Sequence, residues 1–276
     1  MTTTRERCLA LVDCRSRVEQ GASGRLGPKD IMRGLSGTGG FSISASAASR
    51  DKAAKRKQDV RTERCIYCGS ERDLTVDHVP PKLLLMRPHP ENLITVPACR
   101  TCNQSFQKDD EYTRTLLSVD VRASRNSAAR SNLPAVSRSL QRPDARGFVE
   151  YLASQTTQST VLGPDGSPIG QVIELDKSRV NRTGQRIVRA LHFVEVGTPL
   201  ADSVVRVGSN MGLRATDADT ITIARALKTL PDWRDGSVGT AFSYVAAIGP
   251  GFSFWFMLLY DFFFWLGTVD SRGVKA

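Results

Sequence analysis

The amino-acid sequence predicts an α+β protein in which a small zinc-stabilised strand–strand–helix module precedes a separate α+β domain with a β-rich C-terminus. Two C-x2-C pairs, "CIYC" and "CRTC", enclose two strand-like stretches, and paired cysteines at this spacing are typical of metal sites. Further along, apolar residues at helical spacing give way to short apolar runs between turn residues, a pattern typical of mixed helix and strand structure.

Length and composition indicate an ordinary globular protein. The 276 residues, of which 40% are hydrophobic and 24% charged, are enough for one large or two small domains. This composition excludes a collagen, a coiled coil or a wholly disordered chain. The formal charge of +10 favours a polyanionic partner such as nucleic acid. Residues 1–60 carry twelve Lys and Arg against six Asp and Glu, so much of this excess lies in an N-terminal arm.

Composition divides the chain into four parts. Residues 1–60 are rich in Gly, Ser, Ala and Thr and predict a disordered basic arm, whose end is interpreted either as a solvated charge run or as a phosphate-contacting segment. Residues 61–121 contain the paired cysteines. Residues 122–147 have six arginines and no lysine, which favours an Arg-rich linker with a short helix. Residues 148–276 predict an α+β domain of unknown role.

The cysteine pairs predict a structural zinc site. Two C-x2-C pairs supply four thiolates, and a tetrahedral four-cysteine site is the usual home of structural zinc. Because such a site has no open coordination position, the zinc would hold the fold and perform no chemistry. The start of the chain has no apolar stretch like that of a secretory signal, so we expect a reducing cytoplasm. The predicted ligands are Cys65, Cys68, Cys99 and Cys102.

The segment between the cysteine pairs predicts a hairpin followed by a helix. "LTVDH" is a strand-like stretch, the loop "VPPKLLLMRPHPE" follows, and "NLITV" returns as a second strand before a helix that starts near Cys102. "DDEYTRTLLSV" continues as a helix, for which Asp109 or Asp110 is a plausible cap.

The remainder of the chain supplies one more hairpin, a long helix and a strand-rich end. "STVLGPDGSPIGQVIEL" predicts two strands around a Pro-Asp-Gly turn. "SRVNRTGQRIVRALHFV" predicts an amphipathic helix, and we interpret its stripe of arginines, from Arg179 to Arg189, as a solvated face more readily than as a nucleic-acid contact.

The apolar stretch at residues 252–269 predicts core strands, with a membrane anchor as the alternative. Gly249-Pro250-Gly251 precedes it and Asp261 interrupts it, and a buried carboxylate is costly at the middle of a bilayer. We therefore expect no membrane partner.

The cysteine module resembles the HNH endonucleases of the ββα-metal class. The shared pattern is C-x2-C, then "DHVPP", then "NLITVPAC" and a closing "CN", and it spans about Cys65 to Tyr112. Phe106 and Gln107 precede Lys108, which departs from the family's close spacing of Asn and Lys, so Lys108 is not given the family lysine's role.

The resemblance implies a set of catalytic residues. His78 would be the general base that takes a proton from the attacking water. Asp77 and Asn103 would hold one divalent cation, Mg2+ or Mn2+, because both offer hard oxygen ligands. Asn92 would orient His78 or brace the loop. Since neighbouring strand residues point to opposite faces, the resemblance further implies that the strand ends or bends near His78.

The sequence thus predicts a metal-dependent endonuclease that acts on DNA, with RNA as an alternative substrate. The candidate nucleic-acid contacts are Lys82, Arg100 and Lys108. The alternative function is a non-catalytic zinc ribbon that binds nucleic acid or regulates a partner, since such a module would also keep its four cysteines. Nothing in the sequence indicates the sequence specificity, the biological pathway or the oligomeric state.

Overall fold

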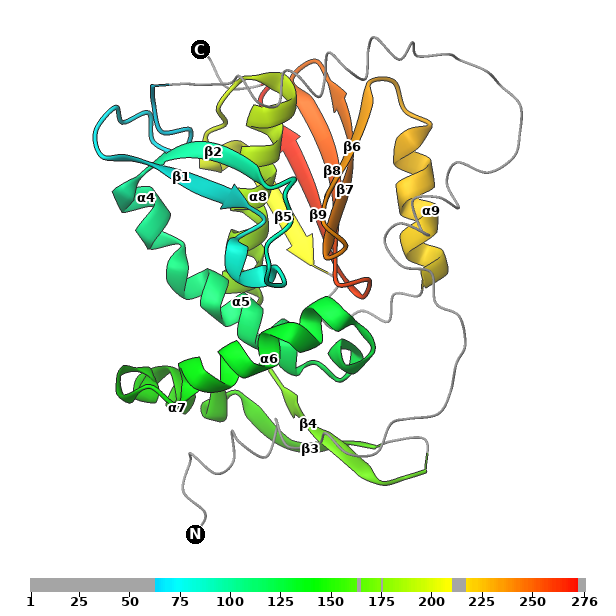
Figure 1. The fold of residues 1–276 in the computed structure, drawn as a ribbon. Helices are drawn as coiled ribbons and strands as arrows, with labels where there is room; N and C mark the ends of the chain where they lie inside the picture. Colours follow the sequence, from blue (N-terminus) through cyan, green and yellow to red (C-terminus); the bar gives the residue numbers. More distant parts are fainter. Residues whose placement is uncertain (1–62, 163–164, 175, 210–216, 273–276) are drawn as a thin grey trace.

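The computed structural model describes residues 63–162, 165–174, 176–209 and 217–272. The predicted N-terminal arm, residues 1–60, lies outside them. The structure has a five-stranded sheet and two two-stranded hairpins. Figure 1 shows the hairpin that follows the first cysteine pair on one side of the molecule, the larger sheet on the other and the long helix α8 (Lys177–Val196) between them. Helix α9 (Asp217–Lys228) lies on the opposite side of the sheet from α8. The predicted α+β fold class is confirmed.

The cysteine module follows the predicted order of strand, loop, strand and helix. Strand β1 (Leu74–Val79) pairs antiparallel with β2 (Ile94–Cys99). The loop between them carries a short 3-10 helix, η1 (Lys82–Leu84). Helices α4 (Arg100–Ser105) and α5 (Gln107–Val119) follow β2.

The region expected to be an Arg-rich linker, residues 122–147, is mostly helical. It contains η2 (Val121–Arg125), α6 (Ser127–Leu140) and η3 (Pro143–Ala145), and α7 (Arg146–Ser154) follows directly. Helix α6 buries small apolar residues and packs against α5. Alanines allow this close packing. The sequence analysis gave more weight to the arginines and prolines around these alanines, which favour a linker, and so underestimated the helix.

The hairpin and helix predicted next are both confirmed. Strands β3 (Thr156–Leu162) and β4 (Pro168–Ile173) pair antiparallel, and Gly166 adopts a φ of 77° in the turn between them. Helix α8 (Lys177–Val196) begins at Asp176, whose side chain accepts hydrogen bonds from the first turn, and ends at Gly197 in the left-handed region. Glycine favours this conformation because it has no Cβ.

The C-terminal stretch forms core strands, as predicted. After η4 (Asp202–Val204), the sheet has the order β5-β9-β8-β7-β6 and is antiparallel throughout. Across the described residues, no helix has the length and apolar character needed to cross a membrane. The elements are β5 (Val205–Ser209), α9 (Asp217–Lys228), β6 (Trp233–Val238), β7 (Phe242–Gly249), β8 (Phe252–Leu259) and β9 (Phe263–Asp270).

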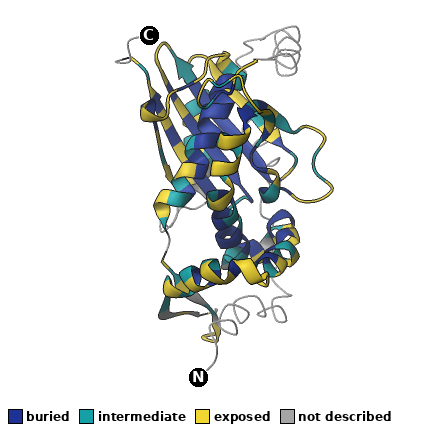
Figure 2. Cartoon of the chain, turned by 90° about the vertical axis from the view of Figure 1, so that its left-hand side faces the viewer, coloured by how far each residue is buried: buried dark blue, intermediate teal, exposed yellow. Residues whose placement is uncertain are grey.

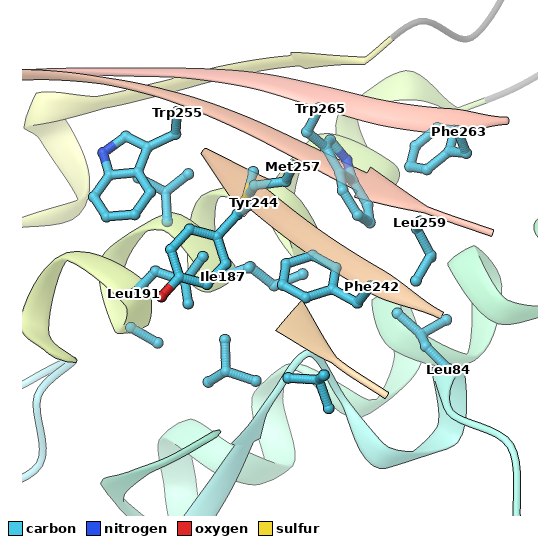
Figure 3. Close-up of a cluster of buried hydrophobic side chains, with 14 of the residues drawn as sticks. Leu84, Ile187, Leu191, Phe242, Tyr244, Trp255, Met257, Leu259, Phe263 and Trp265 are labelled. Atoms are coloured by element: carbon cyan, nitrogen blue, oxygen red, sulfur yellow. The ribbon is translucent and has the colours of Figure 1, made fainter. Parts of the chain in front are cut away.

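One hydrophobic core connects the module to the sheet. Leu84 from η1 belongs to the same buried cluster as Ile187 of α8 and Trp265 of β9, and these side chains are drawn in Figure 3. The hydroxyl of Tyr260 donates a 2.6 Å hydrogen bond to the carbonyl of Leu84. Figure 2 shows the buried residues concentrated where the long helix crosses the sheet. The boundary expected at residue 148 is therefore not a break in the packing.

Candidate metal centre and active site

The four predicted zinc ligands converge at one end of the β1–β2 hairpin. Their Sγ atoms all lie within 4.8 Å of one another, and those of Cys68 and Cys99 are 3.6 Å apart. Four sulfurs around a tetrahedral zinc are separated by about 3.8 Å, given a Zn–S distance of about 2.3 Å. The donor set therefore fits structural zinc. The cluster comprises Cys65, Cys68, Cys99 and Cys102.

Local backbone geometry brings these cysteines together. The amide of Cys65 donates to the carbonyl of Ser70, and Gly69, with a φ of 77°, closes the turn between them. Cys99 is the N-cap of α4, and its sulfur accepts from the amide of Cys102 at 3.4 Å. Burial raises the pKa of Cys65, but hydrogen bonds from backbone amides outweigh it and lower this pKa to about 7. A lower pKa favours the thiolate, which is the form that binds metal.

Strand β1 ends at Val79, one residue after His78, but Asp77 and His78 still lie within its paired part and on opposite faces. The pairing with β2 continues through His78 and Val79 without a register shift. Residues along the strand therefore alternate in burial: Asp77 is 3% exposed, whereas His78 is only partly buried. The side chains of neighbouring residues in a paired strand point to opposite faces.

The buried carboxylate of Asp77 contacts two residues outside the hairpin. The Tyr67 hydroxyl donates to its Oδ2 at 2.6 Å, and Nε of Arg186 lies 3.3 Å from the same oxygen. Burial raises the pKa of Tyr67 well above its usual value, and the negative charge of Asp77 is the second cause of this increase. Tyr67 therefore stays a hydrogen-bond donor. Asp77 thus contacts the turn between Cys65 and Cys68 through Tyr67, and helix α8 through Arg186.

Arg186 connects Asp77 to a second buried carboxylate. Its Nη1 lies 2.6 Å from Oδ2 of Asp110, which is on α5, and its guanidinium stacks 4.7 Å from the centre of the Phe106 ring. Burial raises the pKa of Asp110 to about 6, although the charge of Arg186 acts in the opposite direction. Two carboxylates and one guanidinium therefore share a buried position between the module and α8.

The arginine stripe of α8 was interpreted as a solvated face, and this is wrong for its second half. Arg186 and Arg189 are buried, and Arg189 donates to the backbone oxygens of Leu200 and Tyr67. Arg179 and Arg182 both bind Asp109. The stripe faces the module because its acidic and carbonyl partners lie there, and an amphipathic pattern alone does not reveal such partners.

The acidic residues at the start of α5 do not cap the helix, in contrast to the prediction. Phe106 occupies the N-cap position without a side-chain capping bond. Asp109 and Asp110 lie within the first turn, where negative charge is favourable, and their carboxylates bind the arginines of α8. They fix α5 to α8.

Asn103 lies close to the part of β1 that carries Asp77. Its Nδ2 donates to Oγ1 of Thr75 at 3.2 Å and to the carbonyl of Val76 at 3.3 Å. Thr75 and Asp77 are two residues apart and share a face of the strand. Because these bonds use the amide nitrogen, the amide oxygen is the atom with which Asn103 would hold a cation.

Asn92 braces the loop between the hairpin strands. Its Nδ2 donates to the carbonyl of Ser237 at 2.8 Å, and its Oδ1 accepts from the amide of Gly239 at 3.1 Å. These contacts fix the loop to the end of β6 and to the turn that follows it.

His78 is partly buried beside two other basic residues. Burial is the largest cause that lowers the pKa of His78, and the positive charge of Lys82 lowers this pKa further. His89 has a smaller effect in the same direction. Its imidazole therefore stays neutral at neutral pH, as a general base must be.

The candidate nucleic-acid contacts are all exposed, but they are spread over the module. Lys82 lies in η1, Arg100 opens α4, and Lys108 lies in the first turn of α5. The backbone carbonyl of Lys108 accepts a hydrogen bond from Arg179.

A cleft of about 370 Å³ lies between the start of α5 and α8. Its lining includes Tyr67, Phe106, Asp110, Arg186 and Arg189. Tyr67 and Arg186 are the contacts of Asp77 that the sequence analysis missed. The charge of Arg186 and its place on the helix were visible, but nothing local indicated that it would contact a strand so far away in the sequence.

Comparison with known proteins identifies one relationship. Residues 65–108 match the family model described as HNH endonuclease. Searches of the curated proteins and of the solved structures found no significant match. The matched residues contain all four cysteines, Asp77, His78, Asn92 and Asn103. This part of the chain is therefore similar to HNH endonucleases, and the similarity supports a nuclease-type function.

Proposed function

We propose that the protein is a metal-dependent endonuclease that hydrolyses phosphodiester bonds in DNA. The observation that carries the proposal is the family match over residues 65–108, a range that contains every residue of the proposed site. The hydrogen bonds of Asn103 to β1 support it, since they bring its amide to the strand that carries Asp77.

In this proposal each polar residue of the module has one task. Asp77 and Asn103 would hold a single Mg2+ or Mn2+, and their oxygen atoms are the ligands that these cations prefer. The cation would supply neutralisation of the scissile phosphate and of the departing oxygen. His78 takes the proton of the attacking water. Asn92 keeps the loop after β1 in place through its two contacts with the end of β6 and the turn that follows it.

The three remaining candidates would contact the phosphate backbone. Lys82, Arg100 and Lys108 are exposed, as residues that bind phosphate must be before the substrate arrives. The geometry adds one requirement. Because His78 and Asp77 lie on opposite faces of β1, the end of this strand must turn when substrate binds, so that both side chains reach the same phosphate.

Plasmid cleavage with Mg2+ or Mn2+ tests the proposal. We expect the His78→Ala variant to lose about 10²- to 10⁴-fold in rate, the usual contribution of a general base, while it retains zinc and DNA affinity. His89→Ala is the matched control, because His89 is a partly buried loop histidine whose charge acts on His78 and to which the proposal gives no role in the reaction. Unchanged cleavage by His78→Ala would remove His78 as the base, and single-stranded DNA and RNA in the same assay identify the substrate.

A second candidate function is favoured by the contacts of Asp77. A carboxylate that binds Tyr67 and Arg186 inside the protein is suited to a structural role. In that case the module would be a non-catalytic zinc ribbon that binds nucleic acid or regulates a partner. This candidate predicts salt-sensitive DNA binding with no metal-dependent turnover, so the same assay separates the two functions.

A further inference from the structure

We propose that Arg186 is an internal competitor for the divalent cation, and that Asp77 binds this cation only when the guanidinium moves away. The inference rests on the proposed function, because it takes Asp77 as a ligand of the cation. It adds that helix α8, which carries Arg186 and lies outside the matched residues 65–108, limits the binding of the cation at Asp77.

The competition follows from position and charge. The side chains of Asp77 and Arg186 are 4% and 3% exposed, and Nε of Arg186 lies 3.3 Å from Oδ2 of Asp77. Water screens charges weakly at such a buried position. A divalent cation at Asp77 would therefore be strongly repelled by the guanidinium, and the two cannot occupy the same carboxylate oxygen.

The contacts of Arg186 are unequal, which allows it to release one carboxylate and keep the other. Its Nη1 hydrogen bonds to Asp110 at 2.6 Å. Its Nε, in contrast, makes no hydrogen bond within the described part of the chain despite its proximity to Asp77. A rotation about the side chain would thus break no hydrogen bond at Asp77 and preserve the contact with Asp110, while the incoming cation would replace the guanidinium as the counter-charge of Asp77.

The surroundings of Arg186 offer space for this movement. The cleft of about 370 Å³ is lined by Arg186 and by its partner Asp110. Phe106 also lines the cleft and stacks against the guanidinium. The guanidinium can therefore withdraw toward the cleft without entering the packed core.

Helix α8 sets the resting position of Arg186. Nε1 of Trp265 donates to the carbonyl of Val180 at 3.1 Å, which fixes α8 to the sheet. Arg189, one turn after Arg186, donates to the carbonyl of Tyr67 at 2.8 Å. The cation site is therefore coupled to the C-terminal sheet through one helix.

The test measures Mn2+ binding directly, by electron paramagnetic resonance of the zinc-loaded full chain. We expect Arg186→Leu to bind Mn2+ at least about tenfold more tightly than the wild-type protein. This is the low end of the effect that a neighbouring cation has on the proton affinity of a carboxylate. Arg182→Leu is the matched control, because Arg182 lies one turn earlier on α8 and binds Asp109 instead of Asp77.

Two outcomes overturn the inference. One is an equal Mn2+ affinity of the wild type and Arg186→Leu. The other is a gain that persists when Asp77→Asn is added, since the cation would then bind elsewhere. If Arg186→Leu fails to fold, the variant with Arg186→Leu and Asp110→Asn removes both charges of the tight pair and carries the same expectation.

Plasmid cleavage measured in parallel separates this inference from the proposed function. A gain in Mn2+ affinity that depends on Asp77, without cleavage by any variant, supports the competition and removes the nuclease. Cleavage that depends on His78, with no effect of Arg186 on Mn2+ affinity, supports the nuclease and overturns the competition.

Discussion

The two ends of the β1–β2 hairpin differ in what determines their structure. At one end, four cysteines converge within 4.8 Å, and local turns and a helix cap position them. At the other end, Asp77 and His78 diverge to opposite faces, and Asp77 binds Arg186 of α8. The first end is built by two pairs of cysteines, each pair positioned by residues close to it in the sequence. The second depends on helix α8, which lies much later in the sequence.

This difference shows that a motif can be complete in the sequence while its geometry is decided elsewhere. Zinc ligands need only short spacings and a reverse turn. A buried carboxylate, in contrast, requires a partner for its charge, and here that partner comes from outside the motif. Variants that act on one end alone can therefore test the comparison.

The largest effect is expected from loss of a zinc ligand. Cys65 is buried, and Cys65→Ser removes a thiolate from a type of site whose binding free energy is on the order of 10 kcal/mol. We expect the variant to lose zinc and the hairpin to unfold, as measured by metal analysis and hydrogen exchange. Cys8→Ser, which changes a cysteine outside the described residues, is the control. A hairpin that stays protected without zinc would contradict the prediction.

A smaller effect is expected when α8 is pushed away from the sheet. A Cβ at Gly184 would lie 2.6 Å from Cδ1 of Trp265 and 2.8 Å from Cγ1 of Val207. Gly184→Ala should therefore lower the free energy of unfolding by about 1–3 kcal/mol and leave the zinc content unchanged. Gly147→Ala is the control, since nothing lies within 4 Å of its Cβ position. Loss of zinc in Gly184→Ala would show that the two ends are not independent.

The pH dependence of stability tests a buried histidine on α8. Burial lowers the pKa of His192 from 6.5 to about 4, so the folded state keeps it neutral while the unfolded chain binds a proton at a higher pH. Its contribution to stability is thus complete above pH 6.5 and is lost as the pH falls toward 4. Between pH 7 and pH 5 we expect a loss of about 1–2 kcal/mol.

Urea unfolding at the two pH values measures this loss. His192→Leu cannot titrate, so the difference between the two proteins isolates the histidine from the other ionisable groups. Parallel pH profiles for the wild type and His192→Leu would contradict the prediction.

The smallest effect is expected at Asn92, which contacts the β6–β7 turn from an exposed position. Asn92→Ala removes two hydrogen bonds and should lower the free energy of unfolding by about 1 kcal/mol. Asn92→Asp keeps the acceptor for the amide of Gly239 and should recover part of this loss. If Asn92 instead orients His78, cleavage would fall in Asn92→Ala far more than stability does.

Much of the fold was predictable because its signals are local. The alternation in "LTVDH" and "NLITV", the Pro-Asp-Gly turn and the apolar spacing of α8 each depend on a few neighbouring residues, and all are confirmed. The strands at residues 252–269 were predictable because Gly249 to Gly251 and Asp261 interrupt an apolar run. Helix α6 was underestimated, since its stabilising contacts with α5 are tertiary.

For the candidate site, the sequence by itself determined which residues are candidates for the chemistry. The spacing of the cysteines, the Asp-His pair and the closing asparagine was sufficient to predict the zinc cluster and the family resemblance. The tertiary structure alone decided the partners of these residues. Arg186 and Arg189 are buried against the module, although a helix with this pattern would expose them in isolation. The physical reason is that a buried charge requires a counter-charge, and only folding brings Asp77 and Asp110 to α8.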